Sequence, residues 1–204
     1  MEDMAAAPQR HSMDTEEMPA YKLKRRRRIL DAALSALSDQ DYEQIRISEV
    51  AQRAGVAQGT LYRYFVSKDH LYAVVLQDWL ANISADQIAP ASSAAKDRIR
   101  ARVHAVIGAF ERQPRFFKLL MLLYSSNDVE VDPIRTAIAG NAQRLLARDM
   151  DVLGTPTTQD TAIMLWSIIS SQLVNAAYHD GSYAEIYRIA DVYIDMLPES
   201  GRPG

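Results

Sequence analysis

The chain has 204 residues, of which 48% are apolar and 24% are charged, a composition that suits one or two compact domains with a buried core. The absence of cysteine excludes disulfides, a thiol nucleophile and cysteine-bound metal sites, and it fits a cytoplasmic protein. No apolar run reaches the roughly 20 residues that a membrane-spanning helix needs, so we expect no membrane partner.

The net charge of −3 is unevenly distributed along the chain. Residues 1–20 carry one arginine and five acidic residues, and this polar segment is expected to be a disordered tail without the basic start of a signal peptide. Residues 21–70 carry ten basic and six acidic residues, whereas residues 71–204 carry twelve and fifteen. One basic segment in an acidic chain indicates a local site for a polyanion.

Apolar residues at three- and four-residue spacing predict helices from Lys22 onward and no strand, so the predicted fold class is all-α. The expected helices cover residues 22–38, 48–54, 59–65, 68–88, 96–113, 115–126, 133–152, 158–179 and 183–197. Ser48 and Ser67 are predicted N-caps, and Gly55 is predicted to end its helix in the left-handed conformation. Ser182 and Glu185 form a predicted capping box.

Residues 47–65 fit two helices joined by a four-residue turn, the helix-turn-helix arrangement whose second helix fits the DNA major groove. Arg63 can donate two parallel hydrogen bonds to guanine, and Gln58 can pair in the same way with adenine. Hydroxyl groups suit phosphate oxygens. The polar side chains expected to face outward from the second helix are Gln58, Thr60, Tyr62, Arg63 and Tyr64.

Basic residues flank this pair of helices on both sides. Lys68 follows Ser67 at a predicted helix start, where free amides and the helix dipole attract a phosphate. The run from Lys24 to Arg28, which includes Arg25 and Arg26, can reach the flanking DNA backbone or an adjacent minor groove. The alternative is a solvated helix end with no DNA contact.

The string from Ile47 to Lys68, ISEVAQRAGVAQGTLYRYFVSK, resembles the DNA-binding signature of the tetracycline-repressor (TetR) family, and the preceding residues 28–33 resemble its first helix. The resemblance implies a helix-turn-helix domain over residues 21–67 and a helical regulatory and dimerisation domain over residues 68–200. The phosphate contacts that it implies are Ser48, Thr60, Tyr62, Tyr64 and Lys68. The residues that it places near bases are Gln58, Gly59 and Arg63.

The same resemblance implies a transcriptional regulator, more often a repressor than an activator, that binds double-stranded DNA as a homodimer. Its operator is expected to be palindromic, with half-sites one helical turn apart. A small molecule is expected to release the DNA. No cofactor is expected.

The predicted helix 158–179 is apolar nearly all round, which indicates burial on several sides. One of those sides is expected to face a second subunit, where two helices from each copy form a four-helix interface. The expected dimerisation residues on this helix and the last one are Val174, Tyr178, Ile186, Ile189 and Tyr193.

Large, soft side chains with a few polar neighbours on the middle helices fit either a small-molecule pocket or an ordinary core. The residues expected to line a pocket are Phe117, Met121, Tyr124 and Trp166, with His104 and Asn175 as polar anchors. This composition favours an apolar effector, and the scattered histidines favour no metal. The chain also resembles actinobacterial regulators of sterol catabolism, which implies a steroid-like or acyl-CoA effector.

Two other functions remain as alternatives. An enzyme would need a catalytic motif, and the sequence has no nucleophile elbow, phosphate loop or dinucleotide fingerprint, although Asp191 and Asp195 lie one turn apart. A membrane-surface protein would use the arginine run on anionic lipid. That function leaves the helix pair of residues 47–65 unexplained.

Overall fold

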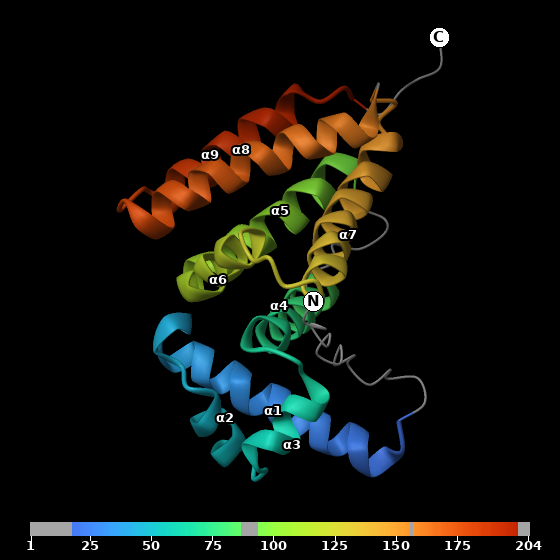
Figure 1. Cartoon of the computed structure of the whole chain (residues 1–204). Coiled ribbons are helices and arrows are strands. Elements are labelled where there is room, and N and C mark those ends of the chain that lie inside the picture. Colours follow the sequence, from blue (N-terminus) through green and yellow to red (C-terminus); the bar gives the residue numbers. More distant parts are fainter. Residues whose placement is uncertain (1–17, 87–93, 156, 200–204) are drawn as a thin grey trace, which may run out of the picture. The chain divides into compact units, whose positions relative to one another are not determined.

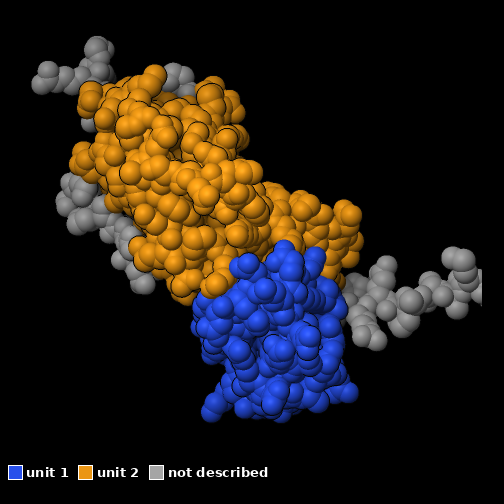
Figure 2. All heavy atoms as spheres, turned by 90° about the vertical axis from the view of Figure 1, so that its left-hand side faces the viewer, with its two compact units in different colours: residues 1–72 blue, residues 73–204 orange. Residues whose placement is uncertain are grey.

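The structure is a computed structural model that describes residues 18–86, 94–155 and 157–199 (Figure 1). Within these ranges the chain forms helices and no strand, which confirms the all-α prediction. It divides into two compact units, residues 1–72 and residues 73–204, which Figure 2 colours separately. Most of the predicted tail, residues 1–17, lies outside the described residues.

The first unit contains α1 (Ala20–Asp39), the 3-10 turn η1 (Tyr42–Gln44), α2 (Ile47–Arg53) and α3 (Gln58–Tyr64). It also includes the first turn of α4 (Lys68–Asp86). Helix α2 packs against α1 and α3. The apolar stripe predicted for α1 faces this core, because spacing of three and four places its members on one side of a helix. The buried core residues include Ile29, Leu30, Ala33, Leu37, Val50, Leu61 and Phe65.

The second unit contains the rest of α4 together with α5 (Ala95–Arg112), α6 (Pro114–Tyr124), α7 (Asp132–Asp151), α8 (Thr158–Tyr178) and α9 (Tyr183–Met196). Helix α8 packs against α6, α7 and α9, and α5 packs against α7 and α9 (Figure 1). These five helices form the bundle that carries the unit's core and its cavities.

Every described α-helix begins and ends within two residues of its predicted bounds, apart from the predicted positions 87 and 88, which lie outside the described residues, whereas the 3-10 element η1 was not predicted. Pro114 and Pro133 occupy the first turns of α6 and α7, where a missing amide proton costs nothing. Gly154 follows α7 with a φ of +66°. Proline and glycine therefore mark the helix ends as the sequence predicts.

The serine caps give a mixed result. The amide of His70 donates to Ser67 Oγ at 2.8 Å, which confirms Ser67 as the cap of α4. The prediction for Ser48 is wrong, because α2 begins at Ile47 and its N-cap position is Arg46. Ile47 is buried, so the helix starts early enough to place this side chain in the core.

The capping box predicted for α9 is also wrong. Ser182 occupies the N-cap position, but its side chain makes no capping hydrogen bond. The Glu185 carboxylate pairs instead with Arg188 at 3.1 Å, one turn further along the helix. An ion pair at this spacing stabilises an exposed helix by about 0.3 kcal/mol.

Candidate nucleic-acid interface and ligand cavity

The turn between α2 and α3 is closed by backbone hydrogen bonds around Gly55. Gly55 adopts a φ of +64°, which glycine reaches without the steric cost that a Cβ brings. The Val56 amide donates to the Ala51 carbonyl at 3.0 Å, and the Gly55 amide donates to the Gln52 carbonyl at 3.0 Å. These bonds satisfy carbonyls at the end of α2 and hold the direction in which α3 leaves the turn.

Helix α3 presents a polar surface opposite its buried Leu61. Gln58, Gly59 and Arg63 are exposed, and Thr60 and Tyr62 are half-buried. Positions 58 and 62 are four residues apart, as are positions 59 and 63, so these two neighbouring pairs share one side of the helix. This side combines two amide or guanidinium donors with a glycine that permits close backbone approach, which is the chemistry that reads base edges in the major groove.

Ser48 is exposed on α2. The side chain of Tyr64, in contrast, is buried. Tyr64 was expected to face outward with Tyr62, but it is only 5% exposed. Tyr64 lies three residues after Leu61, so both side chains point to the core side of α3. The prediction of an outward-facing Tyr64 is therefore wrong, and most of its ring contributes to the core of the first unit.

The basic run lies in the first turns of α1. The Arg26 guanidinium lies 5.2 Å from the centre of the Phe65 ring, at the end of α3. Arg27 pairs with Asp31 at 2.9 Å, one turn along the same helix. Arg25 is half-buried. The run is thus helical, and Arg26 joins the start of α1 to the end of α3 by a cation–π contact.

Lys68 makes internal contacts that the sequence did not predict. Its ammonium donates to the Tyr42 carbonyl at 2.6 Å and lies 4.1 Å from the centre of the Tyr42 ring. The Tyr42 hydroxyl donates to the Asp69 carboxylate. Burial lowers the pKa of Lys68 from its ordinary value, and burial followed by the Asp69 hydrogen bond raises the pKa of Tyr42. These contacts fix the first turn of α4 to η1.

The second unit encloses a cavity of about 220 Å³ between helices α4 to α8. Its walls are mostly apolar, and the polar side chains among its lining residues are Gln77, Tyr124 and Asn141. Burial raises the pKa of Tyr124, so this hydroxyl stays protonated at neutral pH. An apolar cavity with a few polar groups is suited to binding an amphipathic small molecule. The lining also includes Leu80, Val106, Phe110, Leu120, Ile138, Leu145 and Trp166.

Two of the six predicted pocket residues, Tyr124 and Trp166, line this cavity. Phe117 is fully buried in the core, where its ring lies 5.2 Å from that of Phe110. Met121 is half-buried on α6 and is not among the lining residues. Phe117 and Met121 are thus not among the residues that line this cavity, because helix periodicity identifies apolar faces but does not show which face borders a void.

The two predicted polar anchors also lie away from the cavity lining. His104 Nε2 lies 2.8 Å from Asp191 Oδ1, so this histidine joins α5 to α9. Arg100 binds the same oxygen through its Nε at 3.1 Å. Asn175 is exposed near the end of α8. Neither His104 nor Asn175 contacts the cavity, since α5 and α8 turn these side chains to other faces.

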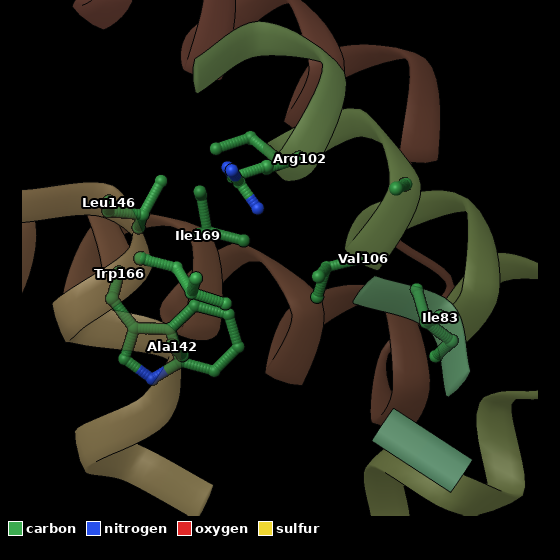
Figure 3. Close-up of a pocket in the computed structure, with 10 residues that line it drawn as sticks. Ile83, Arg102, Val106, Ala142, Leu146, Trp166 and Ile169 are labelled. Atoms are coloured by element: carbon green, nitrogen blue, oxygen red, sulfur yellow. The ribbon is translucent and has the colours of Figure 1, made fainter. Parts of the chain in front are cut away.

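A second cavity of about 60 Å³ shares walls with the first. The side chains that line both cavities are Val106, Ala142, Leu145 and Trp166. Among the described residues that line the small cavity, Arg102 is the charged one. Figure 3 shows its side chain extending from α5 towards Leu146 and Ile169.

The predicted dimerisation residues differ in their exposure. Tyr178 is exposed, and Val174 and Ile189 are half-buried. Ile186 is 1% exposed, so the prediction that it faces another subunit is wrong, because it packs into the core of its own chain. The half-buried Tyr193 donates through its hydroxyl to the Thr161 carbonyl at 3.0 Å, which joins α9 to α8.

Helices α8 and α9 also expose large apolar side chains beyond the five named above as dimerisation residues. The exposed side chains are those of Ile163, Met164, Val192 and Met196. Met196 is 79% exposed. Large apolar side chains gathered on adjacent helices are typical of an interaction surface.

In the described ranges, no group of three or more His, Cys, Asp or Glu side chains is arranged to hold a metal ion. A helix long and apolar enough to cross a membrane is likewise absent from those ranges.

Residues 29–75 match the family described as bacterial regulatory proteins, tetR family. The chain is 30% identical over 184 residues to the HTH-type transcriptional repressor KstR of Rhodococcus jostii, a match that covers 87% of this chain and 84% of that protein. It is 35% identical over 139 residues to KstR of Mycobacterium tuberculosis, covering 65% of this chain and 61% of that protein. The relatives are thus named as transcriptional regulators and not as enzymes.

Solved structures share the fold. A TetR transcriptional regulator from Rhodococcus sp. RHA1 superimposes with a TM-score of 0.72 at 21% identity, covering 86% of this chain and 96% of that one. FadR from Bacillus subtilis in complex with stearoyl-CoA gives a TM-score of 0.65 at 16% identity, covering 86% and 99%. A regulator from Saccharomonospora viridis in complex with choline gives 0.68 at 16%, covering 88% and 100%. The chain belongs to the tetR family of bacterial regulatory proteins and is a DNA-binding transcriptional regulator with a helix-turn-helix domain.

Proposed function

We propose that this chain is a repressor that binds a palindromic operator as a homodimer and is released by a small, largely apolar effector. The observation that carries the proposal is the exposed polar side of α3, with Gln58, Gly59 and Arg63 together on one surface. A rigid turn around Gly55 holds this surface. Arg63 and Gln58 read base edges, while Gly59 allows the backbone to come close.

Phosphate contacts around this surface orient α3 on the duplex. Ser48, Thr60 and Tyr62 are the hydroxyl groups that we assign to phosphates, because all three are exposed or half-buried on the helix-turn-helix pair. Lys68 keeps two ammonium protons for a phosphate beyond the one that it donates to Tyr42. Arg25 and Arg26 extend the positive charge along α1. Tyr64 contributes to DNA binding indirectly, because its buried ring packs on the core side of α3 and stabilises that helix.

A homodimer supplies the second copy of α3 that a palindrome requires. Exposed apolar side chains on α8 and α9, including Met164 and Met196, suit the contact between two copies. Val174, Tyr178, Ile189 and Tyr193 lie on the same two helices, where they border such a contact. Two helices from each subunit would form a four-helix interface.

The larger cavity is the proposed effector site. Its apolar walls, with Gln77, Tyr124 and Asn141 among them, suit a steroid-like or acyl-CoA effector. Stearoyl-CoA in the related fold of FadR supports this class of ligand. Helix α4 contributes Gln77 and Leu80 to the cavity wall, and its first turn is fixed to η1 by Lys68. A movement of α4 would therefore alter both the cavity and the helix-turn-helix unit.

The coupling between effector binding and operator binding can be expressed as a free energy. An effector that prefers the non-binding conformation by about 1–3 kcal/mol would weaken operator binding by roughly 5–150-fold, and operator would weaken effector binding by the same factor. The DNA that flanks the protein's own gene is the first operator candidate to examine.

Nuclease footprinting on that flanking DNA tests the proposal. We expect a protected stretch with two-fold sequence symmetry, and we expect an apolar effector to abolish the protection. A variant in which Gln58 is replaced by alanine serves as the comparison and should protect the same stretch only at higher protein concentration. If the wild-type chain protects no stretch, or if it binds anionic vesicles in preference to any duplex, the proposed function is wrong.

A further inference from the structure

The small cavity differs from the large one in having a charged wall. Apart from Arg102, the lining residues in the described ranges are apolar, including Ile83, Leu146 and Ile169. The Arg102 side chain is 20% exposed, so most of it is removed from water. A guanidinium beside an apolar cavity has lost much of its hydration, which makes it a strong partner for an anion that enters there.

The guanidinium of Arg102 is held in place by Asp149. Arg102 Nε donates to Asp149 Oδ2 at 2.9 Å, and Arg98 Nε donates to Oδ1 of the same carboxylate at 2.8 Å. The Asp149 side chain is 9% exposed, so this ion-pair cluster between α5 and α7 is largely shielded from solvent. Asp149 therefore orients Arg102 through its Nε edge.

The other edge of Arg102 remains available. In the part of the chain that the structure describes, Nη1 and Nη2 of Arg102 form no hydrogen bond in addition to the one that Nε makes with Asp149. These two nitrogens form a planar fork whose spacing matches the two oxygens of a carboxylate. Because Asp149 already restricts the guanidinium, less conformational entropy is lost when a ligand binds.

We infer that Arg102 binds the carboxylate of the effector, which narrows the proposed class to an amphipathic acid, such as a steroid-like acid and not an acyl-CoA thioester, with its apolar body in the larger cavity. This inference rests on the proposed effector site. The two cavities are neighbours that share Val106 and Trp166 in their walls, and the inference places one molecule across both. Its carboxylate oxygens accept hydrogen bonds from Nη1 and Nη2 while Nε keeps its bond to Asp149. Arg102 thus selects acids over neutral molecules of the same shape.

Matched ligands test this selection on the unmodified chain. The probes are dodecanoate and methyl dodecanoate, which share one alkyl chain and differ in the charge of the head group. Binding is followed through tryptophan fluorescence, since Trp166 lines both cavities, and through calorimetry. We expect dodecanoate to bind at least about tenfold more tightly than its ester, because hydrogen bonds to charged groups are stronger than those between neutral ones.

The outcomes separate the inference from the function on which it rests. If acid and ester bind equally well and release DNA equally well, the effector site stands and the carboxylate selection by Arg102 is wrong. If neither probe binds, both the effector site for apolar molecules and the anion site are overturned.

Two variants locate the selection in one side chain. Arg102→Met removes the fork and should abolish the preference for acid over ester while the ester still binds. Arg98→Met is the matched control, because Arg98 contacts the same carboxylate but does not line either cavity. The control should retain the preference, and circular dichroism checks that both variants fold. A preference that survives in Arg102→Met, or one that Arg98→Met loses to the same extent, would contradict the inference.

Discussion

Tyr62 and Tyr64 lie two residues apart on α3, yet Tyr62 is half-buried and Tyr64 is 5% exposed. Two residues correspond to about 200° of rotation around a helix, so the two rings leave opposite sides of α3. We therefore expect Tyr64 to stabilise the fold and Tyr62 to be available for DNA binding.

Alanine in place of each tyrosine should affect a different property, stability for Tyr64 and DNA binding for Tyr62. Tyr64→Ala should lower the free energy of unfolding by roughly 3–5 kcal/mol, because it removes a buried aromatic ring. Tyr62→Ala should change that free energy by less than about 1 kcal/mol and should weaken DNA binding through the loss of a phosphate contact. Denaturant unfolding and fluorescence anisotropy with duplex DNA measure the two effects. A stable Tyr64→Ala protein would show that the ring is not part of the core.

The ionisation of the Tyr187 hydroxyl is expected to change the stability of the folded chain. Its hydroxyl donates to Glu111 at 3.0 Å, and burial followed by this hydrogen bond raises the pKa of Tyr187 to about 12. Because the folded-state pKa lies above the unfolded value of about 10, the stabilisation is complete below pH ~10 and is lost as the pH rises towards about 12.

Unfolding measured across this alkaline range tests the assignment. Tyr187→Phe should make the free energy of unfolding decline less steeply with pH than it does in the wild-type chain. Tyr21→Phe is the control, since Tyr21 is 61% exposed, and it should leave the pH dependence unchanged. Identical alkaline profiles for all three proteins would rule out the contribution of Tyr187.

At the scale of elements, the helices were predictable from the sequence because their apolar residues repeat at helical spacing and proline or glycine marks their ends. Contacts between elements were not predictable. The Lys68–Tyr42 contact joins residues 26 positions apart, and periodicity within one helix carries no information about such a partner. The cavity is a further example, because a void depends on how several helices pack and not on the pattern of any one of them.

The two glycines of the helix-turn-helix pair should respond oppositely to the same substitution. Gly55→Ala should destabilise the chain by about 1 kcal/mol, because its φ of +64° is strained for alanine. Gly59→Ala should stabilise it by roughly 0.5–1 kcal/mol, since Gly59 lies within α3 and its added Cβ would meet nothing within 4 Å. Thermal unfolding compares the two variants.

Gly59→Ala also distinguishes stability from recognition. Its Cβ would project from the exposed side of α3, so operator affinity should fall although the helix is more stable. If Gly59→Ala binds operator as tightly as the wild-type chain does, the backbone at position 59 does not approach the bases.

At the scale of the whole molecule, the proposed homodimer would bring two copies of α3 to one operator. The proposed contact uses apolar side chains on α8 and α9 that a single chain leaves exposed, among them Met164 and Met196. A charged group in the centre of such a contact is costly unless it finds a partner. The dimer should therefore be sensitive to charge at these positions.

Sedimentation of charged variants measures the oligomeric state. The double variant Met164→Lys, Met196→Lys should sediment as a monomer and bind one half-site weakly. Val129→Lys is the control, because Val129 is 81% exposed and lies outside α8 and α9, and this variant should remain a dimer. A double variant that stays dimeric would place the contact between copies on another surface.

The role of α3 in reading bases is tested most directly by the affinity of Arg63→Ala for operator and for unrelated duplex DNA. Arg188→Ala removes the same charge from another exposed side chain, on α9, and serves as the control. We expect Arg63→Ala to lose about 10–100-fold in operator affinity and little in affinity for unrelated DNA, while Arg188→Ala binds operator like the wild-type chain. Operator binding that persists undiminished in a folded Arg63→Ala protein would contradict the assignment of α3 as the element that reads the DNA sequence.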